Sequence, residues 1–189
     1  MLIDVARQLF AKLGVENTTM NDIAVASHKG RRTLYTYFNN KNEVYQAVLE
    51  TELEQMHKAL QTVASFNLPA DEKLLLFFNT RFDTIKKVVA RNGTLKADFF
   101  RDIWRVQTVR KSFDRKEIQL LKDILNRGVE DGIFEMPDTD AIAAILHHAL
   151  KGLEVPYIRG QFSTMYNKER EEPQSKNIAY LIFEGIKKK

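Results

Sequence analysis

Apolar residues recur every three or four positions along much of the chain, which is the spacing that gives an α-helix one buried face. The first such stripe ends at Gly14, a residue type that commonly follows the last turn of a helix. Glycine and proline are scarce, at 8 and 4 residues out of 189, and they fall between the periodic segments. No stretch of the sequence alternates long enough to predict a sheet. The pattern therefore predicts an all-α protein.

Three short helices are expected within the first 40 residues. The second begins at Thr19-Met-Asn-Asp22, which resembles a capping box with Asp in the place of the usual Glu or Gln. A tight turn over Ser27–Gly30 separates it from a third helix over about 31–38, on which Leu34 and Phe38 are expected to face inward. Two short helices joined by such a turn are typical of a helix-turn-helix, whose second helix enters the major groove of DNA.

Longer helices are expected in the remainder of the chain, after a cap at Asn39-Asn40. Their predicted ranges are about 40–66, 71–91, 95–111, 114–131, 139–160 and 177–186, with a joint at 67–71 and a polar segment at 161–175. The segment Leu74–Phe78 is apolar almost all round, which is typical of a helix at the centre of a core. We interpret residues 1–45 as one domain, containing the helix-turn-helix, and residues 46–189 as a second helical domain.

Composition excludes several kinds of protein. The chain contains no cysteine, which excludes disulfides, cysteine-ligated zinc and cysteine nucleophiles. Its apolar runs are shorter than the roughly 18 residues that span a membrane, and its start does not resemble a signal peptide. The glycine-rich, H-E-x-x-H and G-x-S-x-G motifs of common enzyme sites are absent from the sequence. We therefore expect a cytoplasmic protein that is not an enzyme and uses no membrane, metal or cofactor.

The distribution of charge is more informative than the net charge of +4. Residues 27–42 contain four cations, Lys29, Arg31, Arg32 and Lys41, and no acidic residue. Cations neutralise phosphates, and threonine and tyrosine hydroxyls bind phosphate oxygens. A solvated helix face would carry the same charges, so charge alone leaves both interpretations open. The outward hydroxyls and the inward apolar anchors together favour DNA binding.

A specific motif lies in the same region. The run Thr33-Leu-Tyr-Thr-Tyr-Phe38 is followed by Lys41 and preceded, at a fixed spacing, by Asp22-Ile-Ala24. By these residues, positions 5–45 resemble the DNA-binding domain of the tetracycline-repressor (TetR) family. The rest of the chain resembles the family only in its length and its all-helical plan.

The resemblance implies a nine-helix TetR-like fold that acts as a homodimer on a palindromic operator. It implies that Thr19 touches a phosphate and that Arg31 and Arg32 help to choose bases. With the outward-facing Thr36 included, the candidate DNA-binding residues are Thr19, Arg31, Arg32, Thr33, Tyr35, Thr36, Tyr37 and Lys41. The chain departs from the family at the turn, where His28-Lys29 replaces Gly-Val and Arg32 replaces a common Gly. Histidine tolerates the left-handed backbone conformation less well than glycine.

The second domain offers a dimer surface and a ligand pocket. In this family the last two long helices, here about 139–160 and 177–186, usually pair with their copies, and the alternative is that their apolar residues only close the core of one chain. Aromatic residues could line a cavity for a small-molecule effector or could simply pack the core. The candidate pocket residues are Phe78, Phe82, Phe100, Trp104 and His147. Adjacent His147 and His148 diverge by about 100° on a helix, so they cannot chelate one metal together.

The sequence therefore predicts a DNA-binding transcriptional regulator of the TetR type. Its expected action is that of a repressor, which a small-molecule effector releases from a palindromic operator. The alternative is a helical protein-interaction module without DNA binding. That alternative explains the amphipathic helices but does not explain the outward face of cations and hydroxyls at Arg31–Tyr37.

Overall fold

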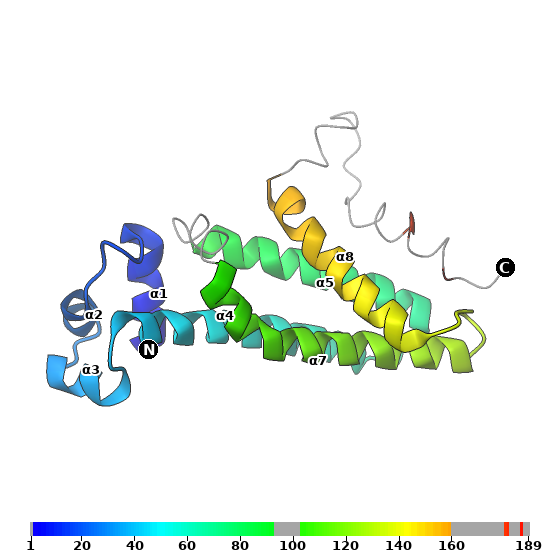
Figure 1. Ribbon diagram of the computed structural model, residues 1–189, viewed down its shortest axis with the longest axis horizontal. Coiled ribbons are helices and arrows are strands. Elements are labelled where there is room, and N and C mark those ends of the chain that lie inside the picture. The colour runs from blue at the N-terminus through cyan, green and yellow to red at the C-terminus, as the bar shows by residue number, and fades with distance from the viewer. Residues whose placement is uncertain (1, 93–102, 160–179, 182–185, 187–189) are drawn as a thin grey trace. The chain divides into compact units, whose positions relative to one another are not determined.

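The computed structural model describes residues 2–92, 103–159, 180, 181 and 186, and this part of the chain is helical and contains no β-strand (Figure 1). Its helices are α1 (Leu2–Leu13), α2 (Met20–Ala26), α3 (Arg31–Tyr37), α4 (Lys41–Ala64), α5 (Ala70–Arg91), α7 (Ile103–Glu130) and α8 (Thr139–Ile158). The all-α prediction is confirmed. The predicted helices at 95–111 and 177–186 lie partly outside the described residues, so the count of nine helices stays a prediction.

One predicted boundary is wrong. The sequence indicated a helix that ended near Lys111 and another that began at Asp114, but α7 runs through this region without a break. No glycine or proline interrupts residues 108–116, so nothing in the backbone stops the helix there. Asp114 does not cap a helix, because its carboxylate accepts a hydrogen bond from Lys151 Nζ at 2.6 Å. A residue type that favours helix starts is here a partner in a long-range ion pair.

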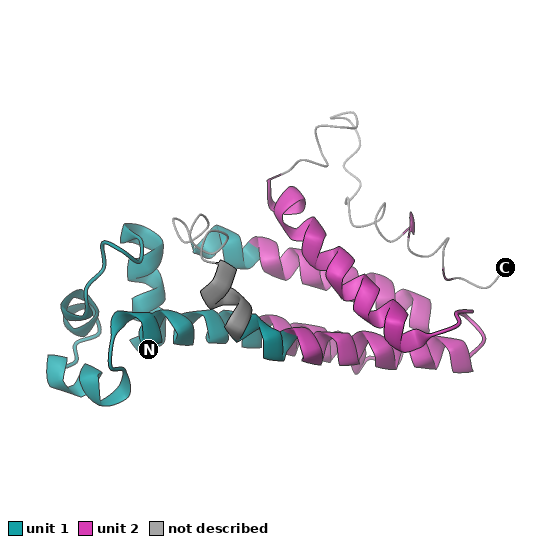
Figure 2. Ribbon diagram, viewed as in Figure 1, with its two compact units in different colours: residues 1–55, 87–113 teal, residues 56–86, 114–189 magenta. Residues whose placement is uncertain are grey.

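Contacts divide the chain into two compact units (Figure 2). Unit 1 comprises residues 1–55 and 87–113, and unit 2 comprises residues 56–86 and 114–189. Helices α4, α5 and α7 each contribute a segment to both units. This grouping reflects compactness and does not test the predicted domain boundary between residues 45 and 46.

Unit 1 has a core built from the short helices and the start of α4. Ala6 and Phe10 of α1, Ile23 of α2 and Leu34 of α3 are each fully buried. The ring of Phe10 packs edge-on against Tyr45 of α4, with ring centroids 5.9 Å apart. Edge-to-face packing is a favourable arrangement of two aromatic rings. The inward positions predicted for α3 are confirmed at Leu34, and Phe38 is half-buried.

Unit 2 has its own core around α5. Leu74, Phe77, Phe78 and Phe82 of this helix are fully buried, whereas Leu75 and Leu76 of the apolar run are half-buried. Further fully buried apolar side chains of the unit are Leu60 of α4, Leu121 and Leu125 of α7, and Ala143 and Leu150 of α8. No helix in the described part of the chain is both long and apolar enough to cross a membrane.

The turn after α7 depends on two glycines. Gly132 has a φ of +70°, a left-handed conformation that glycine adopts without a steric cost. The turn brings Phe134 back so that its backbone N–H donates to the carbonyl of Gly128 at 3.0 Å. A Cβ atom at Gly128 would collide with the ring of Phe134 and would lie 3.0 Å from the Cβ of Ala70. The end of α7 can therefore pack in this way only because residue 128 has no side chain.

Candidate functional site

Helix α2 begins with a reciprocal capping box, as the sequence predicted. Thr19 Oγ1 accepts a hydrogen bond from the backbone N–H of Asp22 at 3.1 Å and donates to Asp22 Oδ2 at 2.7 Å. The backbone N–H of Thr19 donates to the same carboxylate oxygen at 2.8 Å. The bonds from the Thr19 hydroxyl and backbone lower the pKa of Asp22. A phosphate that accepts from the Thr19 hydroxyl would therefore replace its bond to Asp22.

The turn between α2 and α3 keeps helix-turn-helix geometry despite its unusual residues. The backbone N–H of His28 donates to the carbonyl of Val25 at 3.1 Å, and that of Lys29 donates to Ala24 at 3.0 Å. These two bonds form a Schellman motif, in which the residue after the C-cap is left-handed. His28 takes that position with a φ of +52°. Gly30 is the N-cap of α3.

Helix α3 exposes the candidate residues and buries its anchor. Leu34 is fully buried against the core of unit 1, which orients the opposite face of the helix outward. The exposed residues of α3 are Arg31, Arg32, Thr33, Tyr35, Thr36 and Tyr37. The Arg31 guanidinium lies 5.8 Å from the centre of the Tyr35 ring, within the range of a cation–π contact. The Thr36 hydroxyl donates to the carbonyl of Thr33 at 2.7 Å, which leaves its oxygen free only to accept.

Lys41 differs from the other candidates because it is half-buried at the start of α4. Its Nζ donates to the backbone carbonyl of Glu16, 25 residues earlier, at 3.0 Å. The helix start is fixed by Asn40, whose Oδ1 accepts from the backbone N–H of Glu43 at 3.1 Å. Hydrogen bonds from the side chain and backbone of Asn39 lower the pKa of Glu43. An ammonium group has three N–H donors, so the bond to Glu16 leaves Lys41 able to reach a phosphate as well.

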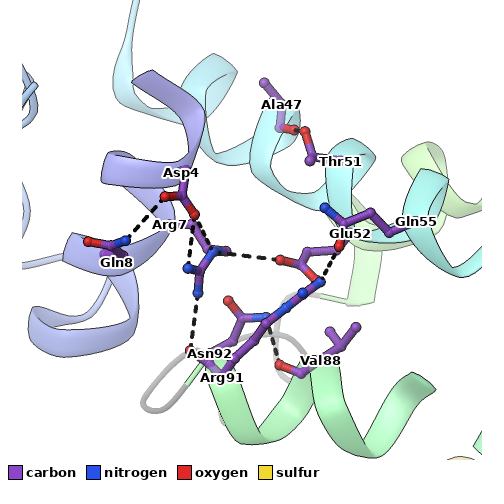
Figure 3. A network of polar contacts seen from close by, with 10 residues as sticks. All are labelled: Asp4, Arg7, Gln8, Ala47, Thr51, Glu52, Gln55, Val88, Arg91 and Asn92. Carbon is purple, nitrogen blue, oxygen red and sulfur yellow. Dashed lines mark hydrogen bonds and ion pairs between the residues drawn. The ribbon is translucent and has the colours of Figure 1, made fainter. Parts of the chain in front are cut away.

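An ion-pair cluster in unit 1 connects α1 to α4 and α5 (Figure 3). Arg7 lies at its centre. Arg7 Nη2 donates to Asp4 Oδ1 at 3.0 Å, Arg7 Nη1 donates to the carbonyl of Arg91 at 3.2 Å, and Arg7 Nε lies 3.9 Å from Glu52 Oε1. Glu52 also pairs with the Arg91 guanidinium, and Arg91 Nη2 donates to Gln55 Oε1 at 2.7 Å. These residues border a cleft of about 350 Å³.

Six charged side chains alternate in sign within unit 2. Arg81 Nη2 lies 2.7 Å from Glu154 Oε1, and Arg81 Nε lies 2.6 Å from Glu117 Oε1. His147 Nδ1 lies 3.2 Å from the same oxygen of Glu117, and its Nε2 lies 3.5 Å from Asp114 Oδ1. Asp114 then pairs with Lys151 at 2.6 Å. These ion pairs therefore form one continuous series that connects α5, α7 and α8, in the order Glu154, Arg81, Glu117, His147, Asp114 and Lys151.

Burial and pairing act against each other in this chain of charges. Burial lowers the pKa of His147, but the carboxylates of Asp114 and Glu117 outweigh it and leave the pKa raised. Burial raises the pKa of Glu117, but Arg81 and His147 outweigh it and leave the pKa lowered. The pKa of Asp114 is lowered in the same way, by His147 and Lys151. When His147 is protonated, the cluster contains three positive and three negative charges, and its net charge is zero.

Sequence reasoning missed both of these charge clusters. Glu52 is 3% exposed and lies beside Leu49 and Leu53 on the apolar face of α4. Arg81 is fully buried and lies four residues after Phe77, on the same face of α5. A charged residue at an otherwise apolar position of the stripe was the available signal, because a buried charge requires a partner.

The predicted pocket residues have different environments. Phe78 and Phe82 are fully buried, and Phe82 stacks against Tyr157 with ring centroids 4.7 Å apart. His147 is fully buried and held between two carboxylates, with the His148 ring centroid 5.1 Å away. Phe100 and the side chain of Trp104 lie outside the described residues. Whether these residues line one cavity stays a prediction.

The apolar side chains of α8, proposed for the dimer contact, differ in how far they are buried. On α8, Leu146 and Leu150 are buried within unit 2, and Ile142 and Leu153 are half-buried. Ile145 is 60% exposed on the same helix. A single exposed apolar residue is common on protein surfaces, so the dimer contact stays a prediction.

Comparisons with known proteins agree with this architecture. The family described as "Bacterial regulatory proteins, tetR family" matches residues 2–48, which include α1, α2 and α3. The chain is 22% identical over 152 residues to the HTH-type transcriptional regulator YhgD of Bacillus subtilis (strain 168), covering 77% of this chain and 76% of YhgD. It is 28% identical over 141 residues to the HTH-type transcriptional repressor KstR2 of Mycolicibacterium smegmatis, covering 74% of this chain and 68% of KstR2.

A solved structure has the same fold over nearly the whole chain. It is a transcriptional regulator from Cytophaga hutchinsonii ATCC 33406, with a TM-score of 0.75 and 22% sequence identity. The match covers 99% of this chain and 97% of that protein. The match of fold therefore extends well beyond the helix-turn-helix.

Proposed function

Because this chain belongs to the tetR family of bacterial regulatory proteins and is a helix-turn-helix transcriptional regulator, we propose that it is a repressor that binds a palindromic operator as a homodimer. A small-molecule effector releases it from the operator. The relative KstR2 is named a repressor, which supports this direction of control. Such a protein acts in the cytoplasm, on double-stranded DNA, and performs no catalysis. Residues 1–45 form the DNA-binding domain and residues 46–189 the effector-binding and dimerisation domain.

The surface of α3 carries the DNA-binding proposal. Six of its seven residues are exposed, and they offer two guanidinium groups, two phenols and two hydroxyls to a partner. Arginine pairs in a bidentate manner with guanine in the major groove, so Arg31 and Arg32 choose bases. Threonine, tyrosine and lysine bind phosphates and fix the register of the protein on the duplex. Thr19, Thr33, Tyr35, Thr36, Tyr37 and Lys41 have this second role. The hydroxyls of Thr19 and Thr36 take it by exchanging their bonds to Asp22 and to the Thr33 carbonyl for a bond to a phosphate oxygen. Arginine and tyrosine are also common in protein–protein interfaces, so the match of residues 2–48 to bacterial regulatory proteins is what favours DNA over a protein partner.

The DNA-binding proposal is tested by selecting duplexes from a random-sequence pool and measuring their affinity. Arg32→Ala should weaken binding to the selected duplex by about tenfold or more, since one bidentate base contact discriminates by about 1–3 kcal/mol. It should also relax the preference at one base position. Arg115→Ala is the matched control, because Arg115 is an exposed arginine of α7 in unit 2. Failure of the wild-type protein to bind any duplex in dilute salt would contradict the proposal.

A homodimer through α8 and the segment at 177–186 is supported by the exposed Ile145. A two-fold interface uses the same patch on both copies, so one substitution acts twice. Ile145→Glu should convert a dimer to a monomer in light scattering without unfolding the chain. Val129→Glu, at an exposed apolar position of α7, serves as the control. A wild-type chain that remains monomeric at micromolar concentration would contradict this assembly.

An effector pocket in the second domain is supported by buried aromatic and polar groups. Phe78, Phe82 and His147 are fully buried. The sequence also indicates Phe100 and Trp104 for this lining, and their side chains lie outside the described residues. Arg81 Nη1 is buried and has no hydrogen-bond partner among the described residues, so it offers a donor to a ligand oxygen. An effector must prefer the state that does not bind DNA, and a coupling of about 1–3 kcal/mol lowers operator affinity 5–150-fold. Screening compounds for release of the selected duplex tests this, and release by no compound would favour a constitutive repressor.

A further inference from the structure

Three turns in the described part of the chain use a left-handed residue just after a helix. Gly14 follows α1 with a φ of +85°, and Gly132 follows α7 with a φ of +70°. His28 follows α2 with a φ of +52°, and it is the only residue other than glycine with a positive φ among the described residues. The backbone bonds of His28 and Lys29 repeat those of Gly132 and Ile133. The two turns are therefore equivalent, but only one contains a Cβ atom at the left-handed position.

The left-handed conformation brings Cβ close to the following carbonyl oxygen, so histidine at this position costs free energy relative to glycine. In the described part of the chain this conformation is held by the two backbone bonds of the turn, and the side chain of His28 adds nothing to them. The imidazole of His28 is exposed, and it makes no hydrogen bond, ion pair or ring contact with any described residue. Residues held in sparsely populated backbone conformations cluster at binding sites, where a contact offsets the strain.

The surroundings of His28 indicate which contact this is. Lys29, Arg31 and Arg32 are exposed cations within four residues of His28, and residues 27–42 contain no acidic group. An anionic partner is therefore favoured on this surface. His28 also lies two residues before Gly30, the N-cap of α3, which is the helix that presents the proposed base-reading residues.

We propose that His28 is a positioning residue whose imidazole N–H donates to a phosphate of the operator backbone and so fixes α3 in the groove. The inference rests on the proposed DNA-binding function. A neutral imidazole carries one N–H donor and an imidazolium carries two, so the contact requires no change of protonation. Because every sequence presents the same phosphates, the contact contributes affinity and register but no base preference.

Three variants separate the imidazole from the backbone strain. His28→Gly removes both, His28→Ala removes only the imidazole, and His28→Gln keeps an N–H donor of similar reach. The melting temperature of each variant is measured by thermal unfolding. Its Kd is measured for two duplexes, the one selected by the wild-type protein and the same duplex with one base pair changed.

His28→Gly should raise the melting temperature by about 2–4 °C, the shift that relief of a single strained residue gives in a chain of this size. His28→Ala should leave it close to the wild-type value. Both should weaken binding about tenfold, which corresponds to about 1.4 kcal/mol at 25 °C. The loss should be the same on both duplexes, and His28→Gln should retain most of the affinity.

A His28→Gly variant that is more stable and binds with wild-type affinity would overturn the inference. So would a loss of binding in His28→Ala alone, which would assign the effect to the backbone, or a loss in His28→Gln as large as in His28→Ala. These outcomes leave the proposed function intact, because the wild-type protein binds its selected duplex in each of them. A wild-type protein that binds no duplex would instead refute the proposed function, and this inference with it.

Discussion

Nδ1 of His147 lies 3.2 Å from Oε1 of Glu117, and both side chains are buried in unit 2. The other ring nitrogen faces Asp114 at 3.5 Å. A neutral imidazole can donate from only one nitrogen, so two facing carboxylates favour the doubly protonated form. This pair therefore connects the stability of the second unit to pH.

The pH dependence has a definite sign. The folded pKa of His147 is raised above its ordinary value of 6.5, so its contribution to stability is complete below pH 6.5 and is lost as the pH rises through the folded pKa. In His147→Gln this alkaline loss should disappear, while His148→Gln, which changes an exposed neighbour, should retain it. The measurement is urea unfolding between pH 5.5 and 9. Parallel profiles for wild type and His147→Gln would contradict the assignment.

Lowering the pH should also destabilise this cluster, through its carboxylates instead of its histidine. The folded pKa values of Glu117 and Asp114 are lowered from 4.5 and 3.8. Their contributions are present above those values and are lost as the pH falls through the folded ones. Glu117→Gln should destabilise the protein by about 3–5 kcal/mol at pH 6, because Arg81 and His147 each lose one of their two carboxylate partners and the buried cluster keeps an uncompensated positive charge. Glu130→Gln, at an exposed position of α7, is the control and should change little.

Two glycines in unit 2 should respond in opposite directions to the same substitution. Gly128→Ala places a methyl group against the ring of Phe134, and overpacking of this kind costs about 1–3 kcal/mol. Gly152→Ala meets no atom within 4 Å and should stabilise α8 by about 0.5–1 kcal/mol, the helix preference of alanine over glycine. Thermal unfolding of the two variants tests this. A stable Gly128→Ala protein would show that Phe134 moves aside easily.

Lys41 and Arg32 should differ in what they contribute to DNA binding. Lys41→Ala should weaken binding about equally on all duplexes and reduce the slope of log affinity against log salt by about one, as expected for one phosphate contact. Arg32→Ala should change the base preference instead. Because Lys41 also bonds the Glu16 carbonyl, the melting temperature of the variant must be measured alongside. An unchanged salt slope with a lower melting temperature would assign Lys41 a purely structural role.

The parts of the fold that depend on local signals were predictable from the sequence. The capping box at Thr19 and Asp22, the helix end at Gly14 and the burial of Leu34 each follow from residues within one or two turns. The outward face of α3 follows from the same periodicity. The DNA contacts themselves stay a prediction.

The parts that depend on distant partners were not predictable. Asp114 has the local signature of a helix start, but its partner Lys151 is 37 residues away. Arg81 pairs with Glu117 and Glu154, which are 36 and 73 residues away. Periodicity places a residue on a face of its own helix, but it carries no information about which other helix supplies the opposite charge.

The bonds that Arg7 makes to Glu52 and to the carbonyl of Arg91 have a practical consequence for engineering. A chimaeric regulator that transplants only the first 45 residues onto a foreign sensor would leave both of these partners behind, and the transplanted α1 would keep only its apolar packing, such as that of Phe10 against Tyr45. A graft that also carries α4 as far as Gln55 and the last turn of α5 would keep both partners of Arg7, the Glu52 carboxylate and the Arg91 carbonyl.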